Sequence, residues 1–487
     1  MELFGTAGIR GDVTESVTPS LALSVGRAVG TIADELVLGR DGRVTGPALV
    51  AALEAGATSA GADVTRVGRL PTPALAFASR GCHGIMVTAS HNPPADNGLK
   101  LFDDGEEFDR DAELAVAEAV ENGTEPTGWA DWTQPASASP TDAYRREVGE
   151  YATRFGAVPD DLRIAVDCGN GVAAGSTPAV LRELGADIVT LNANVDGRFP
   201  GRQSKPTPES LEDLRRFVAT VNGYPNPFDS DLAEQPVTGG DPPREVSDSE
   251  GTDQRDGIDF GVGHDGDADR IVIVDDRGEI VHEDTVLAIL AEEYVSQSSL
   301  QDPVVVTTPN ASGRIDTRVT EAGGRVERVR LGALHEGIGR VEELAETGDG
   351  TQVVFAAEPW KHVHPELGRW IDGIASAAVL ARLIADGGLD SLRDPIDERP
   401  YRKVSVACPD PAKQPAMNGL RRRLPEAFPD AGVETEYGIR LSFDDGSWAL
   451  VRPSGTEAYL RLYAESKTVD QLVASIEDHI TTTISEI

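Results

Sequence analysis

The chain has 487 residues, which is too long for one hydrophobic core and predicts about three or four domains. Its 82 acidic residues outnumber its 44 basic ones, so the formal charge is −38 and neither nucleic acid nor a membrane is expected as a partner. Disorder, which such a charge often indicates, is excluded because hydrophobic residues make up 39% of the chain and recur in strand-like and helix-like blocks.

The cationic residues are mostly arginine, since only six lysines occur. A surface of carboxylates is tolerable at molar salt, where the Debye length is about 3 Å, and we interpret it as a halophilic adaptation. The three cysteines, Cys82, Cys168 and Cys408, lack CxxC spacing and indicate neither a disulfide framework nor a zinc site. No charged leader and no long apolar run occurs, so we expect a cytoplasmic protein.

One pattern of strand, glycine turn, helix and second strand occurs three times. The copies begin at Leu36, Ile164 and Val304, and each is typical of a βαβ unit. The copies are too far apart for a solenoid, so they predict three similar domains.

After Pro400 the pattern stops, and strand-like runs at 404–406 and 449–451 with a C-terminal helix predict a different α+β domain. The expected fold class is therefore α/β, with three similar mixed-sheet α/β domains plus a distinct C-terminal α+β domain. A stretch at 221–256, rich in Pro, Gly, Asp and Glu, is predicted to be a solvated acidic insertion in the second domain. The expected domains are 1–140, 141–257, 258–388 and 396–487.

A polar segment at 88–94 follows the apolar strand expected at 84–87. Its Ser90 is a candidate nucleophile toward phosphorus, for which His91 and Lys100 could supply proton transfer or charge. Backbone N–H groups of the turn could hold phosphate oxygens. Serine and asparagine also form turns, so a loop that only caps its neighbours is the alternative.

Three alternating carboxylates, Asp265, Asp267 and Asp269, directly precede the apolar strand expected at 271–274. Carboxylate oxygens suit a hard divalent cation, and Gly266 favours a loop that wraps the ion. The segment lacks the glycine and glutamate positions of an EF-hand, and strands rather than helices are expected around it. Ordinary acidic surface is the alternative.

Two further segments carry cationic or hydroxyl side chains. Near the N-terminus, the glycine-rich loop 4–11 presents Arg10, although a tight strand connection would explain it equally well. Near the C-terminus, a segment without a nucleotide P-loop pattern combines residue types that bind phosphate. These residues are Arg452, Ser454, Gly455 and Thr456, with Arg461 following.

Taken in this order, the segments at Arg10, Ser90, 265–270 and 452–456 resemble those of the α-D-phosphohexomutase superfamily, which includes phosphoglucomutase, phosphomannomutase and phosphoglucosamine mutase. The resemblance spans essentially the whole chain, and the composition resembles a haloarchaeal member. It implies four domains around a central cleft, with the phosphoserine loop in the first, the metal and sugar loops in the third, and a phosphate site in the fourth.

The resemblance also implies roles for single residues. Ser90 would be phosphorylated in the resting enzyme, primed by a hexose bisphosphate, and would complete the coordination of Mg²⁺ by Asp265, Asp267 and Asp269. The residues expected in catalysis are Ser90, Arg10, His91, Lys100 and His362. Those expected to bind substrate or phosphate are Glu358, Lys361, Arg270, Arg452, Ser454, Gly455, Thr456 and Arg461.

The sugar-binding loop at 357–362 departs from the family pattern Gly-Glu-x-Ser-Gly-His. Glu358 and His362 keep their places, whereas Trp360 replaces a hydroxyl expected to contact the sugar and Lys361 replaces a glycine. Lys361 would bind a phosphate or carboxylate, or else pair with surface acids.

We therefore expect a Mg²⁺-dependent phosphohexomutase that interconverts hexose 1-phosphate and 6-phosphate through a phosphoserine and a bisphosphate intermediate. Mannose and glucose phosphates are the expected substrates, and phosphoglucosamine mutase activity is the alternative. A phosphatase and a non-catalytic sugar-phosphate sensor remain as hypotheses of a different class. The partner is a small sugar phosphate, and the oligomeric state is left open.

Overall fold

The computed structural model describes residues 3–5, 8–228, 257–345, 350–454 and 457–487. Its contacts divide the chain into two compact units. The first comprises Met1–His282 and Trp360–Ser391, and the second comprises Glu283–Pro359 and Leu392–Ile487. The sugar-loop residues Glu358 and Lys361 therefore belong to different units.

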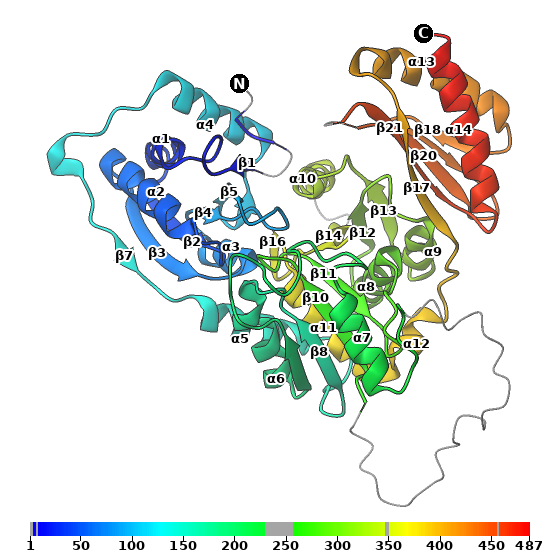
Figure 1. Cartoon of the computed structure of the whole chain (residues 1–487), viewed down its shortest axis with the longest axis horizontal. Helices are drawn as coiled ribbons and strands as arrows, with labels where there is room; N and C mark the ends of the chain where they lie inside the picture. The colour runs from blue at the N-terminus through cyan, green and yellow to red at the C-terminus, as the bar shows by residue number, and fades with distance from the viewer. Residues whose placement is uncertain (1–2, 6–7, 229–256, 346–349, 455–456) are drawn as a thin grey trace, which may run out of the picture. The chain divides into compact units, whose positions relative to one another are not determined.

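The first sheet lies in the first unit and is mixed (Figure 1). Its order is β1-β5-β4-β2-β3-β7, with β6 added on β5; β4, β2, β3 and β7 run parallel, whereas β5 is antiparallel to both β4 and β1. The parallel pair β2 and β3, joined by α2, confirms the first predicted βαβ unit. The strands are β1 (Ile9–Asp12), β2 (Glu35–Arg40), β3 (Asp63–Arg69), β4 (His83–Val87), β5 (Asp96–Asp103), β6 (Glu106–Glu107) and β7 (Ala136–Ser137). The helices are α1 (Pro19–Gly30), α2 (Gly46–Ala60), α3 (Thr72–Ala78), α4 (Arg110–Asn122) and the 3₁₀ turn η1 (Trp129–Asp131).

Helices α1 and α2 lie side by side in the first unit (Figure 1). Helix α1 begins at Pro19, and the preceding Thr18 accepts a hydrogen bond from the Leu21 N–H at 3.2 Å. The two helices approach closely through glycines, because a Cβ on Gly56 would lie only 2.3 Å from the Leu23 carbonyl oxygen. Such a contact leaves no space for a side chain.

The second sheet has the order β11-β10-β8-β9 and also belongs to the first unit. Strands β9, β8 and β10 run parallel, and β11 is antiparallel to β10. The β8-α6-β9 unit confirms the second predicted repeat. The strands are β8 (Arg163–Asp167), β9 (Asp187–Leu191), β10 (Phe260–His264) and β11 (Ile271–Val274). The helices are α5 (Thr141–Ala152), η2 (Val172–Gly175), α6 (Thr177–Leu184) and α7 (Glu212–Val221).

The strands of this sheet come from both sides of the domain boundary that was expected between residues 257 and 258. Strands β10 and β11, which were expected in the third domain, are hydrogen-bonded to the second sheet, where Phe260 pairs with Ile164. The loop of the three aspartates therefore belongs with the second βαβ unit rather than with the sugar loop. The reason is that strand pairing is decided by long-range contacts, which a local pattern does not contain.

The remaining part of the first unit is a hairpin followed by helices. Strands β15 (Lys361–His364) and β16 (Gly368–Ile371) are antiparallel, and α11 (Gly373–Gly387) and α12 (Leu389–Arg393) follow. Asp372 begins α11 by accepting hydrogen bonds from the Ile374 and Ala375 N–H groups. The same carboxylate accepts a hydrogen bond from the Tyr144 hydroxyl at 2.8 Å, which ties α11 to α5.

The second unit contains the third βαβ repeat. Strand β12 is parallel to both β13 and β14, and α9 connects β12 to β13, which confirms this prediction. The elements are α8 (Glu283–Gln297), β12 (Asp302–Thr307), α9 (Gly313–Glu321), β13 (Arg325–Arg328), α10 (Leu334–Leu344) and β14 (Thr351–Glu358).

The C-terminal part of the second unit is antiparallel, with the strand order β17-β21-β20-β19-β18. Helices α13 and α14 pack on its core, which confirms the predicted α+β domain (Figure 1). The elements are β17 (Tyr401–Ala407), α13 (Asp410–Ala427), β18 (Gly432–Glu434), β19 (Ile439–Ser442), β20 (Trp448–Pro453), β21 (Tyr459–Glu465) and α14 (Val469–Ser485).

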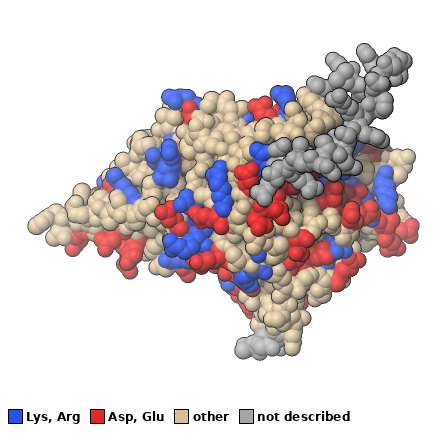
Figure 2. All heavy atoms as spheres, turned by 90° about the horizontal axis from the view of Figure 1, so that it is seen from below, with Lys and Arg blue, Asp and Glu red and all other residues tan. Residues whose placement is uncertain are grey.

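Figure 2 shows Asp and Glu side chains spread over the face in view, with Lys and Arg among them. Arginine pairs with many surface carboxylates, as Arg423 does with Glu486 at 2.8 Å. The halophilic adaptation stays a prediction, as do the domain cleft and the other domain boundaries. Residues 229–256 of the predicted insertion lie outside the described residues. Within the parts of the chain that the structure describes, no helix is long and apolar enough to cross a membrane.

We predict that Gly56→Ala destabilises the first unit by about 1–3 kcal/mol, because the added methyl group collides with the backbone of α1. The measurement is the free energy of unfolding from a urea titration. Gly149→Ala in α5 is the matched control, since a Cβ there meets no atom within 4 Å. The control is expected to be neutral or slightly more stable. Equal effects of the two substitutions would show that the helices do not need this close contact.

Candidate active site

Ser90 lies in the turn between β4 and β5, where its side chain is fully buried. Its φ of 49° is in the left-handed region, which is uncommon for a residue other than glycine. Its hydroxyl donates a hydrogen bond to Asp265 Oδ2 at 2.6 Å and lies 3.2 Å from His91 Nδ1. The structure thus brings the candidate nucleophile from the first sheet to the carboxylate loop of the second.

The three carboxylates Asp265, Asp267 and Asp269 lie in the loop between β10 and β11, as predicted, and all are buried. Each offers one oxygen, and these atoms lie within 4.8 Å of one another. Thr72 Oγ1 donates to Asp267 Oδ2 at 2.6 Å, and Lys100 Nζ donates to Asp269 Oδ2 at 2.6 Å. The Oδ1 atoms of Asp267 and Asp269 are buried without a hydrogen-bond partner. This oxygen-only donor set fits a divalent cation such as Mg²⁺.

Burial and mutual repulsion dominate the electrostatics of these carboxylates. Burial, followed by the charges of Asp269 and Asp267, raises the pKa of Asp265 well above its usual value. Burial also acts to raise the pKa of Asp269, but the charges of Lys100 and Arg270 outweigh it and hold that pKa below its usual range. Burial acts to lower the pKa of Lys100, yet the neighbouring carboxylates raise it above its ordinary value. Lys100 is therefore a permanent cation beside Asp269.

Three more predicted residues gather around this loop. Arg10 lies on β1 opposite Gly98 of β5, and its Nε is buried without a hydrogen-bond partner. Burial and the charges of Arg270 and Arg10 lower the pKa of His91 to about 2, so its imidazole is neutral. Arg270 Nε lies 3.8 Å from Asp265 and also lacks a hydrogen-bond partner. These unsatisfied guanidinium donors indicate a place for an anion.

Lys361 is brought to the same region by backbone pairing. It forms an isolated antiparallel bridge with Arg270, and the Ile271 N–H donates to the Trp360 carbonyl oxygen at 3.2 Å. Its positive charge contributes to lowering the pKa values of His91 and Asp269. Like charges at directly paired positions repel each other, so the arrangement favours an anion between them.

Trp360 and His362, the other sugar-loop residues of the first unit, make contacts within the protein interior. Trp360 has a φ of 70° and packs against the hydrophobic cluster of the second sheet, which includes Leu214 and Val272. His362 is buried, its Nδ1 lies 2.9 Å from Ser376 Oγ, and burial lowers its pKa to about 3. His362 is thus held as a neutral imidazole, and its catalytic role stays a prediction.

The second unit holds the remaining predicted residues. The Glu358 carboxylate accepts a hydrogen bond from the Gly332 N–H at 3.1 Å. Arg452 donates to the Tyr463 hydroxyl at 2.9 Å, and the Ser454 carbonyl accepts from Lys413 Nζ at 2.7 Å. Arg461 pairs with Glu457 at 3.1 Å, whereas Gly455 and Thr456 lie outside the described residues.

A hollow of about 330 Å³ adjoins the predicted phosphate loop in the second unit. It is lined by three arginines, Arg330, Arg421 and Arg452, together with Tyr437 and Glu436. Arg330 and Arg421 were not among the predicted site residues. Only folding brings them to Arg452, since each is isolated from the phosphate loop in the sequence.

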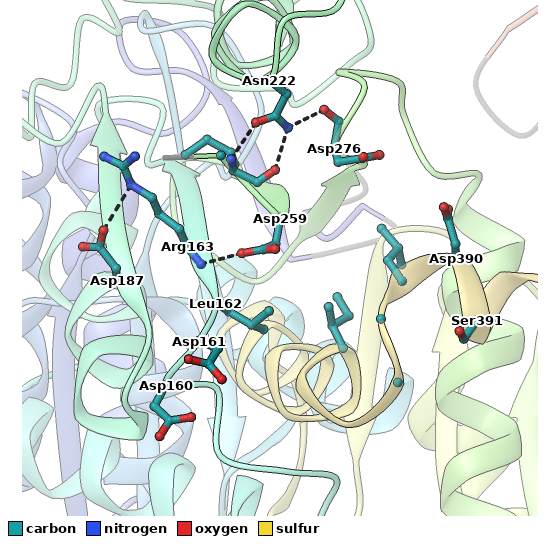
Figure 3. A pocket seen from close by; sticks show the side chains of 16 residues that line it. Asp160, Asp161, Leu162, Arg163, Asp187, Asn222, Asp259, Asp276, Asp390 and Ser391 are labelled. Atoms are coloured by element: carbon teal, nitrogen blue, oxygen red, sulfur yellow. Dashed lines mark hydrogen bonds and ion pairs between the residues drawn. The ribbon is translucent and has the colours of Figure 1, made fainter. Parts of the chain in front are cut away.

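A larger hollow of about 550 Å³ in the first unit has six aspartates among its 16 lining residues (Figure 3). Asn222 donates hydrogen bonds to the Ile258 and Asp276 carbonyl oxygens, and Asp259 accepts from the Arg163 N–H (Figure 3). Arg163 and Asp259 lie at the amino ends of β8 and β10, whereas the carboxylate loop follows the carboxyl end of β10. In an α/β sheet the active site is expected at the carboxyl ends, so this hollow is not the candidate site.

The chain is similar to known proteins over most of its length. Family models described as phosphoglucomutase/phosphomannomutase match residues 1–127 (alpha/beta/alpha domain I), 142–278 (alpha/beta/alpha domain II) and 404–482 (C-terminal domain). A phosphopentomutase of Thermococcus kodakarensis is 37% identical, covering 96% of this chain and 94% of the relative. A probable phosphoglucosamine mutase of Methanopyrus kandleri is 36% identical, with the same coverage of both chains. A phosphoglucosamine mutase of Methanococcus maripaludis is 33% identical, covering 96% of each chain.

Among solved structures, a phosphoglucomutase/phosphomannomutase family protein of Burkholderia thailandensis has a TM-score of 0.79 at 24% identity and covers 100% of this chain and 97% of that one. This likeness supports the fold. Because the family models match most of the chain, and because relatives at 33 to 37% identity span nearly all of it, the chain belongs to the phosphoglucomutase/phosphomannomutase family of the α-D-phosphohexomutase superfamily.

Proposed function

We propose that the protein is a Mg²⁺-dependent sugar phosphomutase that works through phosphorylated Ser90. The observation that carries this proposal is the 2.6 Å contact between the Ser90 hydroxyl and Asp265, within a buried cluster of three carboxylates. A serine that only caps a loop does not require a divalent-cation site at its hydroxyl. A serine that accepts and donates a phosphoryl group does require such a site, because the cation neutralises charge on the group.

In the first half-reaction the bond from phosphorus to Ser90 Oγ breaks while a bond from phosphorus to a sugar hydroxyl oxygen forms. The proton of that hydroxyl ends on Ser90 Oγ, and the second half-reaction reverses the transfer from the other phosphate of the sugar bisphosphate. Lys100, Arg270 and Arg10 would hold the charged phosphoryl oxygens, because their cationic groups lie around the Ser90 loop and the carboxylate loop.

Asp265, Asp267 and Asp269 would hold the Mg²⁺ ion, and the Ser90 phosphate would be its further ligand. When bound, the ion would neutralise charge on the phosphoryl group. The supporting observation is the pair of buried Oδ1 atoms of Asp267 and Asp269 that lack hydrogen-bond partners. Arg452 and the other arginines of the 330 Å³ hollow would bind the phosphate that is not transferred.

Glucosamine phosphate is the first candidate substrate, since several relatives are named phosphoglucosamine mutase. A pentose phosphate is the second candidate. It is supported by the Thermococcus relative and by Lys361, whose ammonium group would repel the ammonium group of an amino sugar but not an uncharged sugar. Mannose and glucose phosphates, named by the family model, complete the set to be tested.

The metal site predicts a specific loss of binding. We expect Asp267→Asn to weaken the binding of Mn²⁺ or Mg²⁺ by at least about 10-fold, measured by calorimetry, because one anionic ligand is lost. Asp390→Asn in the acidic hollow is the matched control, since it removes an aspartate from the other acidic cluster. The same loss in both variants would mean that the ion binds only to the general acidic surface.

The nucleophile predicts a covalent phosphate. Intact mass should show a fraction heavier by one phosphate group in the wild-type protein treated with a hexose bisphosphate, and Ser90→Ala should lack both this species and mutase activity. Ser137→Ala, at an exposed position of β7, should behave as the wild type. Release of inorganic phosphate without isomerisation would identify a phosphatase instead, and a phosphorylated protein that turns over no sugar phosphate would contradict the mutase proposal.

The role proposed for Lys361 predicts that its substitution changes the substrate preference. A coupled assay with the 1-phosphates of glucosamine, ribose, mannose and glucose gives kcat/KM for each sugar. We expect Lys361→Gly to raise the ratio of glucosamine to ribose by about 10-fold, because removing one repulsive charge contact is worth roughly 1.4 kcal/mol or more. Lys205→Gly, at an exposed lysine of the same unit, is the control. An unchanged ratio would show that Lys361 does not distinguish sugars.

A further inference from the structure

Arg43 is fully buried beside the Ser90 loop, although the sequence patterns did not single it out. It follows β2, and all five N–H donors of its guanidinium group are used. Nε donates to Asp41 Oδ2 at 3.1 Å, and the other four donate to backbone carbonyl oxygens of the Ser90 loop. These carbonyls belong to Pro93 (2.6 Å), Asn92 (2.8 Å), Ser90 (2.9 Å) and Asp96 (2.9 Å).

The Ser90 backbone is held on both sides by one connected network. Its carbonyl oxygen accepts from Arg43, and its N–H donates to Thr88 Oγ1 at 2.9 Å. Thr88 Oγ1 in turn donates to Asp41 Oδ2 at 2.9 Å, so both contacts lead to the same buried carboxylate. A buried guanidinium group that is fully paired fixes the geometry of the atoms that it contacts.

Such a network explains the backbone conformation at Ser90. A φ of 49° is unfavourable for serine and persists only where the surroundings impose it. The conformation directs the hydroxyl toward Asp265. Without the contacts of Arg43, the turn would lose four hydrogen bonds that hold it in this shape.

The segment between β9 and α7 reinforces the same contacts. The Phe199 ring lies 5.1 Å from Arg43 Cζ, and Ser204 Oγ donates to the Asn92 carbonyl oxygen at 2.9 Å. Gly266, in the carboxylate loop, lies so near that a Cβ on it would be 2.7 Å from the Ser90 carbonyl oxygen. The carbonyl that Arg43 holds therefore also borders the loop of the three aspartates.

We infer that Arg43 is a positioning residue for phosphoryl transfer, which holds Ser90 in its left-handed conformation and directs its hydroxyl to the carboxylate cluster. This inference rests on the proposed function. Arg43 has no donor left for substrate, so it acts through the Ser90 backbone and not on the reacting phosphate. A substitution of Arg43 should therefore change the rate of phosphoryl transfer and not the affinity for sugar phosphate or metal ion.

The test is Arg43→Lys, which keeps the positive charge but cannot reach four carbonyls and Asp41 together. We expect kcat to fall by about 100-fold, because a small displacement of a reacting group slows a reaction by this order. KM and the affinity for Mn²⁺ should stay within about 2-fold of the wild type. Phosphorylation of Ser90 by a hexose bisphosphate, followed by intact mass, should slow to the same extent.

The matched control is Arg382→Lys. Arg382 is another buried arginine of the first unit that donates to backbone carbonyls, among them those of Phe155 at 2.9 Å and Gly156 at 3.2 Å. It should lose thermal stability and keep kcat. If Arg43→Lys also loses only stability and keeps its kcat, the inference is overturned.

A second variant decides the question if Arg43→Lys does not fold. Phe199→Leu leaves the guanidinium group in place and removes only the ring beside it, so kcat should fall by about 3-fold to 10-fold at unchanged KM. Unchanged kcat in folded Phe199→Leu would then contradict the inference. A wild-type protein that carries no phosphate on Ser90 and isomerises no sugar phosphate would instead overturn the proposed function, and this inference with it.

Discussion

The close approach of the Ser90 hydroxyl to the buried aspartate loop is the constraint on which the first unit depends. Three buried carboxylates with oxygen atoms within 4.8 Å of one another repel strongly, and burial adds to the cost of their charges. Lys100 offsets part of this cost through its contact with Asp269, and Arg270 lies near Asp265. The Oδ1 atoms of Asp267 and Asp269, which accept no hydrogen bond, support the affinity for a divalent cation that we propose.

This constraint explains why the first two sheets lie in one compact unit. The Ser90 turn follows β4 of the first sheet, whereas the aspartate loop follows β10 of the second. Gly266 permits their contact because a side chain there would collide with the Ser90 carbonyl group. Thr72 adds a second connection, since both its hydroxyl and its N–H bind Asp267. Two domains thus form the one site at which we propose phosphoryl transfer.

The predicted sugar loop and the Ser90 turn lie in different parts of the chain. Relatives of similar identity are named for pentose and for glucosamine phosphates, although all share the family. In the sugar loop, Trp360 packs against the core of the second sheet, while the backbone of Lys361 forms a β-bridge with Arg270 beside the aspartates. A substitution in this loop can therefore change the charge beside the aspartates without changing Ser90 or the carboxylate cluster.

The sequence by itself determined the three βαβ repeats, the different C-terminal domain and the two loops that carry Ser90 and the aspartates. These features depend on local periodicity and on short runs of side chains. Tertiary structure decided that β10 pairs with β8, that Arg43 holds the Ser90 turn, and that Arg330 and Arg421 join Arg452. Each of these contacts joins residues far apart in the chain, and its energy comes from burial and hydrogen bonds that exist only after folding.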